Sequence, residues 1–122
     1  MDGSVWYLYS EDAAANIQEY SPDARVIIML RRHADFLESL HQEYVRAGYE
    51  QYQDFATAWQ KRDARRDGRN MPLKSIVPSG LLYEDACFFA PQVERFIDTF
   101  GRERVLIINY DDFSESASSV FD

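Results

Sequence analysis

The chain has 122 residues, 46% of them hydrophobic and 15% aromatic, a size and composition typical of one folded domain. Its 21 acidic and 13 basic side chains give a net charge of −8, which argues against a general nucleic-acid binder, because such proteins gain affinity by neutralising phosphates. The sequence has no apolar run long enough to span a bilayer, no signal-like N-terminus and a single cysteine, Cys87. It therefore predicts a cytoplasmic protein without a nucleic-acid or membrane partner.

The first thirty residues are predicted to form a helix and a strand. Residues 1–10 are aromatic and indicate a short strand or a packed loop. Ser10 is the expected N-cap of a helix over 11–20 with acidic residues in its first turn, and the turn-forming SPD at 21–23 ends it. The continuous apolar, β-branched run at 24–30 predicts a strand covered on both faces, as in a parallel sheet.

Two amphipathic helices are predicted next. The first covers 35–47, with Asp35 and Glu38 at capping-box spacing and Gly48 as its stop. Its apolar face is formed by Leu37, Leu40 and Tyr44. The second helix covers 52–66, and its apolar face is formed by Phe55, Ala58 and Trp59.

The rest of the chain predicts a loop, a helix and a second strand. Residues 66–80 are polar with several glycines and prolines. Residues 81–100 indicate a helix, or two segments meeting at Pro91, that ends at Gly101. The core face of this helix is formed by Val93, Phe96, Ile97 and Phe100. The run at 104–110 is a second buried-strand pattern, followed by a polar tail.

Two buried-type strands joined by helices predict an α/β fold with a short parallel sheet flanked by helices. Two strands are few for a sheet, so its edges need cover from the aromatic N-terminus or from another chain. We therefore expect a homo-oligomer assembled through the sheet edges or the N-terminal segment.

Arg31 and Ser39 are the candidate binding residues. Arg31 directly follows the strand at 24–30, and in open α/β sheets ligands bind beyond the carboxyl ends of the strands. Its planar guanidinium can hold a phosphate with two hydrogen bonds, and Ser39 lies eight residues later, in the first turns of the next helix. Together they would form a phosphate clamp. The alternative is that Arg31 pairs with a surface carboxylate and Ser39 is only solvated.

Other polar residues are weaker candidates. His33 is expected in an exposed loop and His41 on a helix face, and neither has a visible catalytic partner. The basic stretch at 61–69 could meet an anionic acceptor, but its aspartates favour a solvated, self-paired helix end. Carboxylates cluster near the second strand, at Asp111, Asp112 and Glu115. Because their spacing matches no metal loop, we predict no metal and no catalytic residue.

The segment DARVIIMLRRHADFLESLH resembles the strand and helix of the sulfotransferases that use 3′-phosphoadenosine 5′-phosphosulfate (PAPS). In that family the strand ends in Arg, an acidic residue often follows four positions later and a Ser eight positions later; here these are Arg31, Asp35 and Ser39. The resemblance continues through the flanking segments YLYSEDAAANIQEYSPDA and LLYEDACFFAPQVERFIDTFGRERVLIINYDDF. It implies a partial P-loop-type fold in which Arg31 and Ser39 bind the 3′-phosphate of PAPS or of its product, adenosine 3′,5′-bisphosphate (PAP).

Three departures limit what the resemblance implies. Arg32-His33 stands where members commonly have Asn-Pro. The chain contains no Gly-rich phosphosulfate loop with its lysine, and no basic C-terminal loop that closes over the nucleotide. We therefore expect a single truncated sulfotransferase-like domain over 1–122, which keeps the 3′-phosphate half-site and does not catalyse transfer alone.

Two further hypotheses stay open. The chain could be a non-catalytic remnant that acts as an oligomeric interaction module. It could also be a portion of a longer enzyme whose remaining parts lie outside these 122 residues.

Overall fold

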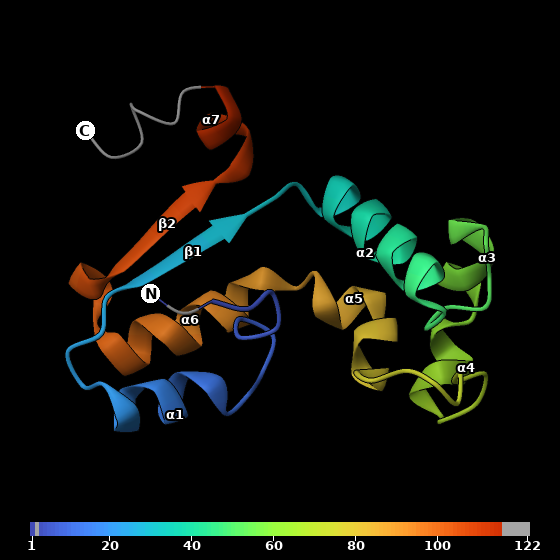
Figure 1. Ribbon diagram of the computed structural model, residues 1–122, viewed down its shortest axis with the longest axis horizontal. Helices are drawn as coiled ribbons and strands as arrows, with labels where there is room; N and C mark the ends of the chain where they lie inside the picture. Colours follow the sequence, from blue (N-terminus) through green and yellow to red (C-terminus); the bar gives the residue numbers. More distant parts are fainter. Residues whose placement is uncertain (2, 116–122) are drawn as a thin grey trace. The chain divides into compact units, whose positions relative to one another are not determined.

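The computed structural model describes residue 1 and residues 3–115 (Figure 1). Contacts divide the chain into two compact units. Unit 1 comprises the chain up to Arg31 and again from Phe88 onward, and unit 2 is the continuous segment Arg32–Cys87. The single domain expected over 1–122 stays a prediction, because the compactness of each unit does not decide it.

Unit 1 is built on two parallel strands, β1 (Val26–Leu30) and β2 (Val105–Asn109). The register pairs Val26 with Val105 and Leu30 with Asn109. Both strands lie within the apolar, β-branched runs that predicted them. The α/β class and the short parallel sheet flanked by helices are therefore confirmed.

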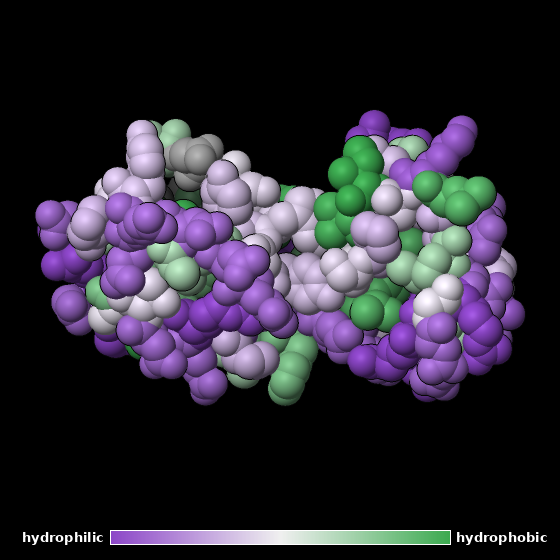
Figure 2. Space-filling model, turned by 90° about the horizontal axis from the view of Figure 1, so that it is seen from below, coloured by the Kyte–Doolittle hydropathy of each residue, from purple (hydrophilic) through white to green (hydrophobic). Residues whose placement is uncertain are grey.

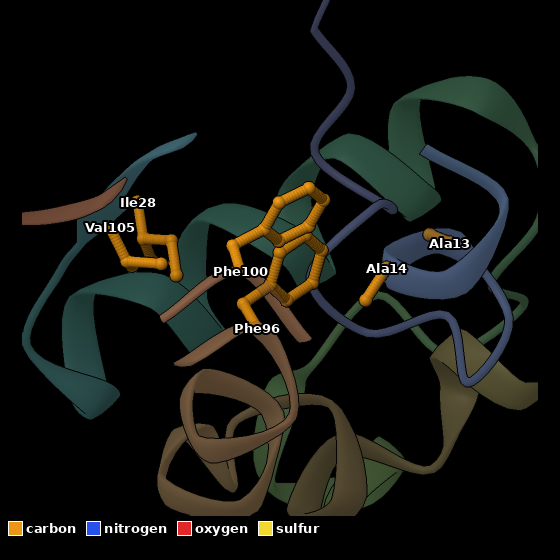
Figure 3. Packing of buried hydrophobic residues seen from close by; sticks show 6 residues of the cluster. All are labelled: Ala13, Ala14, Ile28, Phe96, Phe100 and Val105. Atoms are coloured by element: carbon orange, nitrogen blue, oxygen red, sulfur yellow. The ribbon is translucent and has the colours of Figure 1, made fainter. Parts of the chain in front are cut away.

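Two helices cover one face of this sheet. Helix α6 (Phe89–Phe100) packs against both strands, and α1 (Ala13–Tyr20) packs against α6 (Figure 1). Figure 3 shows the rings of Phe96 and Phe100 lying between strand residues on one side and α1 on the other. The residues on either side are Ile28, Val105, Ala13 and Ala14. The small alanine side chains let α1 approach the phenylalanine rings closely, and the predicted core face of α6 is confirmed.

The opposite face of the sheet is only partly covered: Ile108, which pairs with Met29, is buried there, but its neighbours are not. The side chains of Ile27, Met29 and Leu106 are 50%, 44% and 43% exposed. Ile27 and Leu106 are direct neighbours in the register, so their side chains lie on the same face. The prediction that β1 is covered on both faces is therefore wrong for the part of the chain that the structure describes.

The N-terminal segment is a packed loop rather than a strand. Residues 5–9 form turns, and Arg95 of α6 donates hydrogen bonds to the carbonyl oxygens of Leu8 and Ser10. Because the Ser10 N–H donates to the Trp6 carbonyl, the chain is still turning at this point. Helix α1 begins two residues later than predicted, after Asp12, so Ser10 is not its N-cap and its first turn carries no acidic residue.

The outer side of unit 1 is polar. Figure 2 views the molecule from the side on which α1 lies in Figure 1, and the surface of unit 1 there is mostly hydrophilic. Helix α1 buries Ala13 and Ala14 and exposes Asn16, Gln18 and Glu19. Unit 1 therefore presents a polar surface on its helical side and apolar side chains on the open face of its sheet.

Unit 2 is helical throughout the residues that carry regular structure. Its elements are α2 (His33–Ala47), α3 (Phe55–Gln60), α4 (Arg62–Arg66), the 3-10 helix η1 (Pro78–Leu81) and α5 (Tyr83–Ala86). The helix predicted over 52–66 is divided at Lys61. The helix predicted over 81–100 is divided at Cys87 and Phe88, whereas Pro91 lies in the first turn of α6, a position that proline favours.

The ends of α2 differ in how well the sequence predicts them. Gly48 ends the helix in a left-handed conformation, as expected, and Gly101 likewise ends α6 with a positive φ. The start is different: α2 begins at His33, and Asp35 lies inside its first turn. The carboxylate of Asp35 accepts a hydrogen bond from Arg32 Nε at 2.8 Å, so the predicted capping box of Asp35 with Glu38 is wrong.

Unit 1 should depend on the phenylalanine layer for its stability. Phe96→Ala is expected to lower the free energy of unfolding by about 3–5 kcal/mol, because it leaves a cavity between the sheet and α1. Denaturant unfolding followed by far-ultraviolet circular dichroism measures this loss. Phe88→Ala removes the same side chain from an exposed position and should have little effect. Equal losses for the two variants would contradict the assigned core.

Candidate functional site

Arg31 lies at the carboxyl edge of the sheet in unit 1. It follows Leu30, the last residue of β1, and Tyr110 follows Asn109, the last residue of β2. The guanidinium carbon of Arg31 lies 5.3 Å from the centre of the Tyr110 ring. Arg31 is exposed, and among the described residues no carboxylate forms an ion pair with it. The alternative in which Arg31 is occupied by a surface carboxylate is therefore not seen in this part of the chain.

Ser39 lies on the exposed side of α2 in unit 2. Leu37 and His41, two residues away on either side, are buried. Since successive residues of a helix are rotated by about 100°, Ser39 points away from the buried face. Arg31 and Ser39 belong to different units, and their joint action as a phosphate clamp stays a prediction.

The second arginine of the pair has a local partner. Arg32 Nε donates to the Asp35 carboxylate at 2.8 Å. This exposed pair contributes little to stability, but it places a negative charge in the first turn of α2, where the helix dipole favours it. The acidic residue in the predicted Arg-Asp-Ser pattern is thus a partner of Arg32.

The basic stretch at 61–69 is paired within unit 2. Arg62 Nε lies 2.9 Å from the Glu84 carboxylate, and Arg66 donates to Asp85 at 2.8 Å, so both arginines tie α4 to α5. The hydrogen bonds that Arg66 donates to Asp85 and, with smaller effect, to Glu84 raise the pKa of its guanidinium. The self-paired interpretation holds for Arg69, which pairs with Asp67, but it is wrong for Arg62 and Arg66, whose main partners lie on α5.

Arg65 has a separate role in a buried ionic network. Its Nη2 atom lies 2.8 Å from the Glu50 carboxylate, and both side chains are 0% exposed. Glu50 also accepts hydrogen bonds from the Tyr83 hydroxyl at 2.9 Å and from the Tyr52 N–H at 3.0 Å. Arg65 donates in addition to the carbonyls of Asn70 and Leu81. The network links the segment after α2 to α4, η1 and α5.

His41 borders this network on the buried face of α2. Its Nε2 lies 2.9 Å from the Tyr52 carbonyl oxygen, which indicates the tautomer that carries the proton on Nε2. The ring packs edge-on against Phe55 and Tyr83, at 5.4 and 6.2 Å between ring centres. Burial, followed by the Glu50 carboxylate, raises the pKa of Tyr83, so its phenol stays neutral and donates. Every one of these groups has a protein partner, so we interpret the network as structural.

The remaining candidates show no constellation for chemistry. His33 is the exposed first residue of α2. Asp111, Asp112 and Glu115 lie in α7 (Tyr110–Glu115), and the residues that the structure describes contain no group of three or more His, Cys, Asp or Glu that could hold a metal ion. Cys87 is half-buried, and burial raises the pKa of its thiol. None of the described helices is both long and apolar enough to cross a membrane.

The buried pair should respond strongly to the loss of one partner. Glu50→Gln is expected to lower the free energy of unfolding by about 3–5 kcal/mol, because it leaves the Arg65 charge buried without a counter-ion. Arg65→Met added to Glu50→Gln should cost less than the sum of the single changes. The control Glu43→Gln breaks an exposed pair with Arg46 and should leave stability unchanged. Additive losses in denaturant unfolding would count against the network.

The chain is similar to a solved structure, that of a sulfotransferase from Alicyclobacillus acidocaldarius. The two share 31% sequence identity with a TM-score of 0.77, and the match covers 96% of this chain and 44% of that one. Neither the protein-family models nor the curated proteins give a match. The chain thus spans less than half the length of the sulfotransferase that it matches. Its α/β fold corresponds to a partial sulfotransferase fold, and the chain is sulfotransferase-like.

Proposed function

We propose that the chain carries the 3′-phosphate-binding element of a PAPS-using sulfotransferase, with Arg31 and Ser39 as the phosphate ligands. The observation that carries this proposal is the match to a sulfotransferase over 96% of the chain at 31% identity. The family resemblance depends on the Arg-to-Ser spacing of eight residues between Arg31 and Ser39.

The surroundings of Arg31 support an anion ligand. The side chain stands at the carboxyl edge of the sheet, where α/β proteins bind their ligands. No described carboxylate neutralises it, whereas Arg32, Arg62, Arg65 and Arg66 are all paired. A free, exposed guanidinium can bind a phosphate by two parallel hydrogen bonds.

The proposal assigns binding and not transfer to these residues. Sulfuryl transfer needs groups that stabilise charge on the moving group and on the bridging oxygen, as phosphoryl transfer does. The two lysines, Lys61 and Lys74, lie in no Gly-rich loop, and Lys61 lies over the Tyr52 ring. We infer that the charge-stabilising half of the site comes from other polypeptide, either elsewhere in the same protein or from a second chain.

Calorimetric titration with PAP tests the binding element. The folded chain should bind PAP saturably, and Arg31→Ala should weaken binding by about 10- to 100-fold, since it removes a charge-assisted pair of hydrogen bonds. Ser39→Ala should weaken it by about 2- to 10-fold. The chain alone should transfer no sulfuryl group from PAPS.

Two controls make this titration specific. Arg46→Ala removes an exposed arginine of α2 that is paired with Glu43 and should leave PAP affinity unchanged. Adenosine 5′-phosphate, which lacks the 3′-phosphate, should bind wild type and Arg31→Ala equally. Absence of saturable PAP binding by the folded wild type would refute the proposal.

The open sheet face favours a second candidate function, that of an oligomeric interaction module. Ile27, Met29 and Leu106 form an apolar patch that the described residues cover only in part, and the described sheet has only two strands. Exposed apolar surface and unpaired strand edges favour association with another chain. We propose that a second copy of this chain occupies this face. The net charge of −8 opposes such pairing, so association should strengthen with salt.

Sedimentation velocity over a wide concentration range tests this association. Wild type is expected to form a dimer or larger assembly, and the triple change Ile27→Thr, Met29→Thr and Leu106→Thr should shift it toward monomer. Threonine retains a high β-propensity, so the strands should persist. The control pair Leu73→Ser and Ile76→Ser removes exposed apolar side chains from unit 2 and should leave association intact. A wild type that is monomeric throughout would exclude the module.

A further inference from the structure

A loop of unit 2, residues 71–77, carries a lysine between two exposed apolar side chains. The loop contains no helix or strand, and Leu73 and Ile76 are 104% and 75% exposed. Lys74 lies between them and is also exposed, and no described carboxylate forms an ion pair with it. The tip of the loop is therefore accessible to a second protein.

The main chain of this loop is weakly held. Within residues 71–76 the described structure contains one main-chain hydrogen bond, from the Ser75 N–H to the Pro72 carbonyl, and its length of 3.4 Å makes it weak. The Ser75 hydroxyl is buried and has no hydrogen-bond partner among the described residues. Opening the loop would return this hydroxyl to water, so local opening costs little free energy.

The other basic residues are better protected by the backbone around them. Apart from Lys74 and Arg69, every lysine and arginine of the chain lies in or next to a helix or strand. The Arg69 N–H donates to the Ala64 carbonyl at 2.8 Å. Asn70, which follows Arg69, has a φ of 54°, whereas a peptide that binds as an added strand must be extended. Lys74 is thus the basic residue that a protease reaches with the least unfolding.

We propose that the Lys74–Ser75 peptide bond is a site of limited proteolysis by a protease that cuts after basic residues, and that the cut chain stays assembled as a two-piece protein. Water adds across the amide bond, so one piece ends in the carboxylate of Lys74 and the other begins with the amino group of Ser75. Exposed loop tips are preferred sites of such cleavage. Arg31 and Ser39 remain in the same piece, and the inference does not rest on the proposed function.

The cut divides unit 1 between the two pieces. Residues 1–74 supply α1 and β1, and residues 75–122 supply α6 and β2. The parallel strand pairing and the packing of α1 on α6 therefore both join one piece to the other. Arg95 of α6 also donates to the Ser10 carbonyl at 2.9 Å. Each piece contributes one of the two described strands, so neither forms this sheet without the other.

Unit 2 is divided in the same way. The first piece supplies α2, α3 and α4, and the second supplies η1 and α5. The Tyr83 hydroxyl donates to the buried Glu50 carboxylate at 2.9 Å, and Arg66 donates to Asp85 at 2.8 Å. Both contacts join the two pieces. Two separate sets of contacts, one within each unit, therefore hold the cut protein together.

Limited digestion of the folded chain with trypsin tests the site. Mass spectrometry should detect the fragments 1–74 and 75–122 first, from a cut at least about tenfold faster than any other. Lys74→Gln changes an exposed side chain and should slow the first cut at least about tenfold, whereas Arg69→Gln should leave its rate unchanged. A first cut at any other residue, or digestion of Lys74→Gln at the wild-type rate, would overturn the site.

Sedimentation velocity tests whether the pieces stay together once trypsin has been inhibited. The cut protein should sediment in buffer as the uncut chain does at the same concentration, and the pieces should separate when denaturant is added. Its far-ultraviolet circular dichroism should match that of the uncut chain, because the helices and the strand pairing persist. Pieces that separate in buffer, or a loss of the dichroism on cutting, would overturn the two-piece protein even where the cut occurs at Lys74.

Discussion

The parallel pairing of β1 with β2 is the constraint on which unit 1 depends. Side chains alternate along a strand, so the register decides which apolar residues face α6 and which face outward. A slip of one residue would turn Ile28 away from the phenylalanine layer and bring Ile27 toward it. The same register sets Arg31 beside Tyr110, so the core of unit 1 and its candidate site are fixed by one set of hydrogen bonds.

Unit 2 depends on a buried ion pair as well as on apolar packing. Its helices α3, α4 and α5 have only six, five and four residues, too few for independent stability. The pair of Glu50 with Arg65, together with the Tyr83 hydroxyl, connects the segment after α2 to α4 and α5 through partners far apart in sequence. Burying two charges gives little net stability, but an arrangement in which each donor needs one particular acceptor disfavours other packings. The chain thus uses its arginines in different ways: Arg62, Arg65 and Arg66 connect elements of unit 2, whereas no described carboxylate pairs with Arg31.

Features that follow from local pattern could be predicted from the sequence, and features that need distant partners could not. The strands, the core face of α6 and the stop at Gly48 were predictable, because periodicity and glycine act within a few residues. Asp35 was wrongly predicted to cap the helix, because an aspartate at this position can either cap a helix or pair with the nearby Arg32, and the sequence does not distinguish the two roles. The burial of Glu50 and Arg65 was not predicted, because a charged residue is expected at the surface unless its partner is known, and these partners are 15 residues apart in sequence.

The candidate site shows the same division. The position of Arg31 at a strand end and of Ser39 in the following helix was predictable from the strand pattern and the spacing. The contact with Tyr110 was not, because it requires the register between strands that the whole of unit 2 separates in sequence. Apolar periodicity likewise identified the strands without indicating that one face of the sheet would be partly exposed.

The insertion of unit 2 between β1 and β2 has a consequence for how the protein is made. The paired strands lie about 80 residues apart, and closing so long a loop is slow compared with contacts that form locally. On the ribosome, β1 therefore emerges with apolar side chains on both faces long before β2 is synthesised. Residues 32–87, in contrast, contain both partners of the buried ion pair and can fold during this interval. Aggregation during synthesis is thus a hazard of β1, and early folding of the inserted unit would lessen it by shortening the flexible chain between the two strands.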